Sequence, residues 1–325
     1  MANDAEILRA APNHRLAVEA SRKDVSWSKV GIYAVLFGGV VIAIGPFLWM
    51  ISASFMTLSE VNLTRLLPEN LLWENYATAL RRANFLDIEI GADPQTGVLQ
   101  SLSISGYIWN SIRITLITVL GSLAVCIPAA YAFARMKFVG RNFLFALFLS
   151  TMMIPGIVML IPHLLTVIWL GRLSESLFGP FGAWFNNWPA LTIPFFASVF
   201  NIFLLRQFFI QIPMDLWEAA RIDGAGHPRF LISVVLPLSK APIMTIVTLG
   251  FIGSWNALMW PLLVTINDEW RPIAVGLSNF VTADTPGDLN LQMAASVITV
   301  IPILVLYFVA QKQFTEGIAQ SGIRG

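Results

Sequence analysis

The sequence predicts an all-α integral membrane protein with six transmembrane helices and a helix-Gly-helix loop on the cytoplasmic side. Of the 325 residues, 56% are hydrophobic and only 12% are charged, whereas soluble domains carry about 25% charged residues. The mean hydropathy is +0.71, and uncharged runs long enough to cross a bilayer recur along the chain. This composition excludes a soluble cytoplasmic enzyme, because too few polar residues are present to cover its surface.

Charge and cysteine content exclude further classes of protein. The chain has 20 Lys and Arg residues against 19 Asp and Glu, so no basic surplus is available to bind nucleic acid. Cys126 is the single cysteine and lies in an apolar run. It can form neither an internal disulfide nor a thiolate metal cluster. We therefore expect no nucleic-acid partner and no metal site.

The first expected element is a transmembrane helix over residues 30–52, preceded by a cytoplasmic N-terminal segment, residues 1–29. Residues 30–50 are uncharged and would extend about 31 Å as a helix, close to the hydrocarbon thickness of about 30 Å. The alternative is the core of a cleaved signal peptide, which has about 7–15 residues after a short basic region. The longer run and the mixed charges before it favour an uncleaved helix.

Residues 53–106 form the expected outer segment. Amphipathic fragments surround the run from Trp73 to Tyr76. Residues 87–105 are polar and contain Gly91 and Pro94, so we predict a loop there.

Three further transmembrane helices are expected over residues 112–134, 143–170 and 188–208. The third helix of the chain is long enough to tilt or bend and contains Pro155 and Pro162. The fourth has the shortest uncharged core of the six. Its assignment therefore has the weakest support from the pattern.

The fifth and sixth helices are expected over residues 241–266 and 293–311, which completes a permeation domain over residues 30–311. Residues 211–237 form the loop before the fifth helix. Residues 312–325 form a C-terminal tail.

Basic residues set the predicted orientation. Cytoplasmic loops are enriched in Lys and Arg, and most of the 20 in this chain fall in alternate segments on one side. Those segments carry Arg9, Arg15, Arg22, Lys23, Lys29, Arg135, Lys137, Arg141, Arg206, Arg221, Arg229, Lys240, Lys312 and Arg324. The opposite side carries Arg65, Arg81, Arg82, Arg172 and Arg271. Both termini are therefore expected in the cytoplasm.

The inner loop, residues 211–237, has the signals of two short helices. Asp215 and Glu218 have the spacing of a capping box. Gly224 is placed to end the first helix, and Pro228 suits the first turn of the second. The apolar face of the second helix consists of Phe230, Leu231, Val234 and Val235.

This loop resembles the coupling loop of ATP-binding-cassette (ABC) importer permeases. Their pattern is Glu-Ala-Ala, three residues, Gly, nine residues, an aliphatic residue, one residue and Leu-Pro. The matching residues are Glu218, Ala219, Ala220, Gly224, Val234, Leu236 and Pro237, with Val where Ile is commonest.

The rest of the chain is similar to the carbohydrate-uptake, maltose-permease-like branch of these binding-protein-dependent permeases. The matching residues are Asn110-Ser111, Trp255-Asn256, Trp260-Pro261-Leu262, Gly276-Leu277, Gln313-Phe314, Gly317 and Gly322-Ile323-Arg324-Gly325. Two departures are the longer outer segment around residues 88–105 and the N-terminal lead of 29 residues.

The resemblance implies a permease subunit of a sugar importer in the plasma (inner) membrane of a prokaryote. The implied partners are a second homologous permease in a heterodimer, two ATP-binding subunits and an extracellular or periplasmic solute-binding protein. This chain has no Gly-x-x-x-x-Gly-Lys-Ser/Thr loop. We therefore expect ATP and Mg²⁺ on the partner subunits, no cofactor in this chain and no enzymatic activity.

In the family, the first short helix of the loop sits in a cleft on the ATPase subunit. Glu218 would be its charged contact, Ala219 and Ala220 would allow close approach, and Gly224 would set the angle to the second helix. Asp223 and Pro237 belong to the same implied coupling site, and the resemblance implies a second contact at residues 320–325. The alternative is an interfacial membrane anchor, but anchors are rich in Lys and Arg, whereas the charges here have mixed sign.

Ser254, Trp255 and Asn256 are the candidates for lining the solute pathway, because polar residues within membrane helices mark functional positions. The alternative role is an interhelical hydrogen bond, which we also expect for His163 and Asn201. No set of residues has the spacing of a catalytic site. Import of glycerol phosphate or another polyol derivative is the alternative within this machinery. An ion-coupled secondary transporter is the alternative from another class.

Overall fold

The computed structural model describes residues 27–92, 99–280 and 288–321. The chain divides into two units, Met1–Met50 and Ile51–Gly325. Most of the predicted N-terminal segment and residues 322–325 of the predicted tail lie outside the described residues. Helix α2 (Trp27–Ala53) begins in the first unit and contains Pro46. It is apolar and long enough to cross a membrane.

The second unit contains four more continuous segments of transmembrane length. They are α5 (Tyr107–Arg135), η2 (Gly156–Met159) with α7 (Leu160–Phe178), α8 (Trp188–Thr192) with η4 (Ile193–Phe195) and α9 (Val199–Gln211), and α16 (Leu289–Ser321). A bent pair, His227–Leu238 and Lys240–Trp255, passes the same test with an angle of 80°. The predicted α-helical membrane fold is confirmed. Among the described residues, five single helical segments are long and apolar enough to cross a membrane, and the bent pair makes a sixth if it crosses once.

The third predicted helix, residues 143–170, is wrong as a single element. Helix α6 (Arg141–Thr151) ends before Pro155, and η2 and α7 follow after a break. Proline has no N–H and disfavours helical backbone in the residue before it, which accounts for the break. Pro162 lies in the first turn of α7, where a missing N–H leaves no helical hydrogen bond unmade.

The fifth predicted helix, residues 241–266, is also interrupted. Helix α13 (Lys240–Trp255) stops before Asn256, and α14 (Met259–Val264) follows after three residues. The Asn256 side chain donates to the carbonyl oxygen of Ile252 at 3.0 Å. An Asn side chain that bonds its own backbone competes with helix continuation, and here it caps the end of α13.

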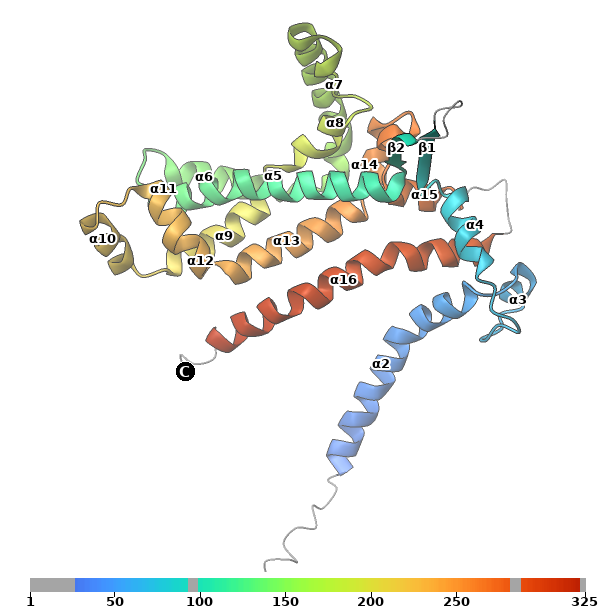
Figure 1. Cartoon of the computed structure of the whole chain (residues 1–325). Coiled ribbons are helices and arrows are strands. Elements are labelled where there is room, and N and C mark those ends of the chain that lie inside the picture. Colours follow the sequence, from blue (N-terminus) through green and yellow to red (C-terminus); the bar gives the residue numbers. More distant parts are fainter. Residues whose placement is uncertain (1–26, 93–98, 281–287, 322–325) are drawn as a thin grey trace, which may run out of the picture. The chain divides into compact units, whose positions relative to one another are not determined.

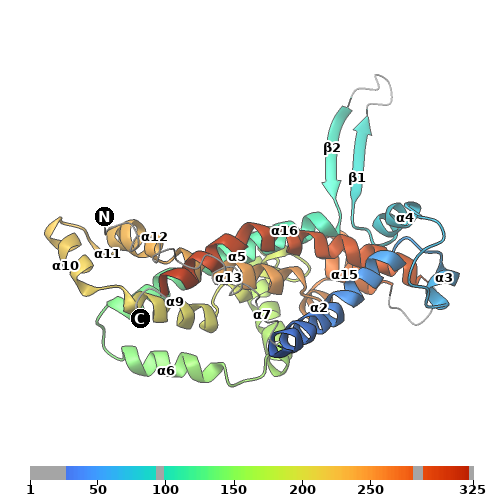
Figure 2. The same cartoon turned by 90° about the horizontal axis from the view of Figure 1, so that it is seen from below.

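The loop predicted over residues 87–105 is wrong for residues 87–92 and 99–105, which form two antiparallel strands. Strand β1 (Asp87–Ala92) pairs with β2 (Leu99–Ser105), and Figure 2 shows the two strands side by side. The polar composition hid a short alternation of apolar and polar residues, over residues 87–90 of β1 and 102–105 of β2, which is the usual pattern of a strand.

Polar contacts tie the outer segment to the start of α16. Asn75 donates its Nδ2 hydrogens to the carbonyls of Ser54 and Met56, both at 2.9 Å, and Asn290 donates to Met56 O at 3.2 Å. Helix α3 (Leu58–Asn62) begins with a capping box between Thr57 and Glu60, and α4 (Glu74–Arg82) follows. The backbone N–H of Glu69, together with Thr57, lowers the pKa of the Glu60 carboxyl.

The core of the second unit lies where α5 contacts α9 and α13 (Figure 1). Cys126 is buried at this contact, and its thiol donates to Phe196 O at 3.4 Å. A cluster of buried side chains continues from there to the inner loop: Ala130, Tyr131, Phe133, Phe145, Ile202, Leu205, Phe209, Phe230, Val235 and Ile246.

The packing of the short helix α15 (Ile273–Ser278) can be tested by substituting Gly276. An added Cβ would lie 2.5 Å from Ala83 O and 2.6 Å from the Tyr107 ring. Gly276→Ala should therefore destabilise the fold by about 1–3 kcal/mol, as overpacking does, and lower the unfolding midpoint in detergent. Gly156→Ala is the control, because no atom lies within 4 Å of its added Cβ. Equal midpoints for the two variants would contradict the packing.

Candidate functional site

The inner loop forms two short helices joined at Gly224. Helix α10 (Met214–Ile222) precedes Gly224, which has φ +74° and donates its N–H to Arg221 O at 3.0 Å. This left-handed conformation favours glycine, so the predicted helix end is confirmed. The predicted capping box is wrong, because α10 begins at Met214 after Pro213 and has no side-chain cap. Asp215 instead lies in the first turn, where a negative charge suits the helix dipole.

The second helix of the loop begins with α11 (His227–Phe230), and Pro228 lies in its first turn as predicted. Residues Leu231–Val235 form a π-helical turn, and α12 (Leu236–Leu238) leads into α13. A π turn of this kind widens the helix locally.

An aromatic cluster fixes this loop to the end of α5. The Tyr131 hydroxyl hydrogen-bonds His227 Nδ1 at 2.8 Å. The His227 ring stacks on Trp217 with centroids 4.4 Å apart and an interplanar angle of 13°. Phe230 is buried beneath Trp217, at 5.1 Å between centroids. Arg135 adds a hydrogen bond to the Ile212 carbonyl. The loop is therefore attached to α5 by specific contacts that join its two short helices.

The outward face of α10 has no cover among the described residues. Glu218 and Ala219 are exposed, Ala220 is partly exposed, and Asp223 is exposed at the helix end. Glu218 forms no ion pair within the described part of the chain. Ile222 is 87% exposed next to these charges. The surface thus combines acidic groups with apolar area.

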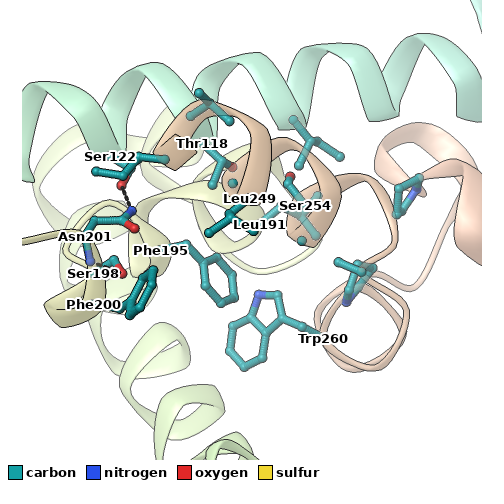
Figure 3. Close-up of a pocket in the computed structure, with 18 residues that line it drawn as sticks. Thr118, Ser122, Leu191, Phe195, Ser198, Phe200, Asn201, Leu249, Ser254 and Trp260 are labelled. Carbon is teal, nitrogen blue, oxygen red and sulfur yellow. Dashed lines mark hydrogen bonds between the residues drawn. The ribbon is translucent and has the colours of Figure 1, made fainter. Parts of the chain in front are cut away.

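A cavity of about 330 Å³ lies between α5, the segment from α8 to α9, and α13 with α14 (Figure 3). Its polar lining consists of Thr118, Ser122, Ser198, Asn201 and Ser254, and its aromatic lining of Phe195, Phe200 and Trp260. No charged side chain belongs to the lining among the described residues.

Hydrogen bonds hold two sides of this cavity. Asn201 Nδ2 donates to Ser122 Oγ at 3.1 Å, which joins α9 to α5 (Figure 3). Trp260 Nε1 donates to Ala190 O at 2.9 Å, which joins α14 to α8. The Phe195 ring meets Trp260 edge-on at 5.8 Å. The cavity therefore has a fixed polar end and a fixed aromatic end.

The three residues predicted to line the pathway lie in three different surroundings in the structure. Ser254 lines the cavity. Trp255 is buried elsewhere, and its Nε1 donates to Thr299 O of α16 at 3.0 Å. Asn256 is exposed and bonds its own helix. The structure therefore brings only Ser254 into this cavity.

The hydrogen bond predicted for Asn201 is confirmed, and the same residue also lines the cavity. His163 instead makes an edge contact with the Trp260 ring at 6.3 Å, and no hydrogen bond to it is found among the described residues. Sequence reasoning missed Thr118 and Ser122 as lining residues. Their spacing of four places them on one face of α5, and this polar pair within an apolar helix was the available signal.

Residues 119–320 match the family described as "Binding-protein-dependent transport system inner membrane component". The chain belongs to this family. It is a permease of an ABC importer, and so a membrane-spanning transport protein and not an enzyme.

Relatives and a solved structure agree with the family assignment. The sn-glycerol-3-phosphate transport system permease protein UgpE of Brucella abortus (strain 2308) is 30% identical over 89% of this chain and 95% of its own length. The UgpE protein of Yersinia pestis is 34% identical over 65% of this chain and 72% of its own length. A chain of a bacterial ABC transporter that imports the acidic polysaccharide alginate has a TM-score of 0.70 and 26% identity, covering 90% of this chain and 98% of that chain.

The attachment of the permease's inner loop can be tested at Tyr131. Tyr131→Phe keeps the ring but removes the hydroxyl bound to His227, and one such bond contributes about 0.5–1.5 kcal/mol. We expect hydrogen–deuterium exchange of residues 214–230 to rise up to about tenfold. Tyr307→Phe, at an exposed tyrosine of α16, is the control. Unchanged exchange in Tyr131→Phe would show that the bond does not hold the loop.

Proposed function

We propose that this permease is one of two related membrane subunits in an ATP-driven importer of a sugar. A heterodimer of permeases would cross the inner membrane with both termini of this chain in the cytoplasm. Two partner subunits would bind ATP and Mg²⁺, and an external binding protein would deliver the solute. The inner loop supports this proposal most directly, since it presents an uncovered acidic and apolar helix on a firmly attached base.

The proposed coupling path runs from α10 to the cavity through α5. Glu218 would pair with a cation of the ATPase subunit, while Ala219 and Ala220 leave room for close approach. When the ATPase subunits close, α10 would carry Trp217 and His227 with it. Tyr131 would then pass the displacement to α5, whose middle turns line the cavity. Such switching is a rigid-body transition between two states that solute and ATP both bias.

The coupling proposal extends to three other features. Gly224 would keep the angle between α10 and α11 constant. Asp223, at the end of α10, and Pro237, in α12, would belong to the same coupling site. Residues 320–325 would touch the ATPase subunits as a second contact. Ser254 would line the solute passage, whereas Trp255 and Asn256, predicted with it, support α13 from outside the cavity.

Glycerol phosphate or another polyol derivative is the second candidate solute. Two relatives that share 30% and 34% identity with this chain are named for sn-glycerol-3-phosphate. Sugar is the first candidate because hydroxyl, amide and aromatic groups line the cavity together, and these groups suit a polyhydroxylated solute.

Glu218→Ala tests the docking of α10. Truncating one side of a desolvated charge pair costs about 2–5 kcal/mol, so recovery of ATPase subunits on the affinity-purified permease should fall at least tenfold. Glu175→Ala removes an exposed carboxylate of α7, on the predicted outer side, and should leave recovery unchanged. Normal recovery and full uptake with Glu218→Ala would exclude Glu218 as a docking contact.

The energy source can be tested in proteoliposomes that contain the permease and its partners. Uptake should require internal ATP and the external binding protein together, because the sequence of this chain lacks the Gly-x-x-x-x-Gly-Lys-Ser/Thr pattern. Collapse of proton and sodium gradients should have no effect. Gradient-driven uptake by this chain alone would establish a secondary transporter instead.

A further inference from the structure

We propose that the end of α5 and the start of α6 form a binding site for one anionic phospholipid of the surrounding membrane. The site goes beyond the proposed import function, because its ligand is neither the solute nor a subunit of the importer. Its cavity shares no lining residue with the cavity shown in Figure 3.

Four cations gather where α5 ends and α6 begins: Arg135, Lys137, Arg141 and Arg206. Arg141 Nη1 donates to the Met136 carbonyl at 3.2 Å, and Arg206 Nε donates to the Phe133 carbonyl at 3.3 Å. None of the four cations forms an ion pair among the described residues. Because like charges without a counter-charge repel one another, a bound anion would stabilise this end of α5.

Two of these cations line a cavity of about 420 Å³. The lining consists of Lys137, Phe138, Gly140, Arg141, Asn142 and Phe143. The printed bonds of Arg141 use its Nη1 and its Nε, which leaves the Nη2 hydrogens to donate to a ligand. Guanidinium and ammonium groups are the side chains that bind phosphate oxygens most strongly. The cavity therefore suits a phosphate-containing headgroup.

Exposed apolar side chains lie next to these cations. Val139 is fully exposed, Phe143 is 71% exposed and Leu147 is 50% exposed. Phe143 and Leu147 are four residues apart and so share one face of α6. A free phosphate ion would leave this apolar surface in water, whereas the acyl chains of a phospholipid would cover it. The combination of cations and apolar strip therefore favours a lipid.

The site also lies at the depth where lipid phosphates are found. The apolar segment Tyr107–Arg135 is long enough to cross a membrane, and the cations begin at its last residue. Phe145 of α6 packs against Phe133 of α5 at 5.5 Å and Phe203 of α9 at 6.4 Å between ring centroids. Helix α6 is thereby held beside these two helices. Basic pockets between membrane helices at this level bind anionic headgroups.

Binding can be measured by native mass spectrometry of the purified permease, residues 1–325, in nonionic detergent. The probe is dioleoyl phosphatidylglycerol. Dioleoyl phosphatidylcholine is the control lipid, because it has the same chains but a headgroup without net charge. Each cation near an anionic lipid contributes about fivefold to its affinity, so phosphatidylglycerol should bind at least 25-fold more tightly. Equal affinities for the two lipids would overturn the site.

Lys137→Gln combined with Arg141→Gln removes the two cations that line the cavity. The affinity for phosphatidylglycerol should fall about 25-fold, and the affinity for phosphatidylcholine should not change. Lys137→Arg combined with Arg141→Lys keeps both charges and should bind as the original chain does. Arg229→Gln combined with Lys240→Gln is the matched control, because it removes two exposed cations outside the cavity.

An unchanged affinity in the Lys137 and Arg141 variant, or an equal loss in the control variant, would contradict the assignment. The single change Lys137→Gln covers the case in which the double variant does not fold. Lys137 is exposed, and its replacement should still lower the affinity about fivefold.

Two further measurements exclude other occupants of the cavity. A large molar excess of soluble glycerol 3-phosphate should leave phosphatidylglycerol bound, and displacement would assign the cavity to a free phosphate compound instead. Recovery of the ATPase subunits should be the same for the double glutamine variant and the original chain. A loss of these subunits with unchanged lipid binding would assign the cations to a protein contact and overturn the lipid site.

Discussion

Helix α5 is hydrogen-bonded to other elements at three levels, and the rest of the second unit depends on these bonds. At its first turns, Asn110 Nδ2 donates to the carbonyls of Glu269 and Arg271 at 2.9 and 3.0 Å. In its middle, Ser122 bonds Asn201, and at its last turns Tyr131 bonds His227. These bonds lie near the two ends and in the middle of one continuous helix. This arrangement also explains the presence of a buried amide at Asn110: it joins the first turns of α5 to the segment that contains Glu269 and Arg271.

The sequence was sufficient to predict the membrane fold, because a bilayer demands long uncharged runs with internally satisfied backbones. It was insufficient for the breaks after α6 and α13. Hydropathy averages over a window of about 19 residues, so it does not register the effect of Pro155 or of the Asn256 side chain on a single turn. The hairpin of β1 and β2 was missed for a different reason, since its alternating pattern is short and its composition is polar.

The two short helices of the inner loop could be predicted from the sequence because neighbouring residues determine them. The left-handed conformation at Gly224 and the position of Pro228 follow from residues within a few positions of each other. The contacts that attach the loop to α5 are not local: Tyr131 and His227 are 96 residues apart in sequence. The cavity depends in the same way on which faces of α5 and α9 meet. Asn201 was therefore predicted as a bonding residue but not as a lining residue, and Trp255, chosen beside Ser254, turned out to face α16.

The buried thiol of Cys126 gives this permease a built-in probe. The thiol is fully enclosed at the contact of α5 with the segment before α9, where the Ser198 N–H donates to Sγ at 3.5 Å. Because the chain has a single cysteine, alkylation reports on one place without any engineered background. A maleimide can reach this thiol only when α5 separates from the segment that contains Phe196 and Ser198. The labelling rate would therefore report any separation of α5 from this segment.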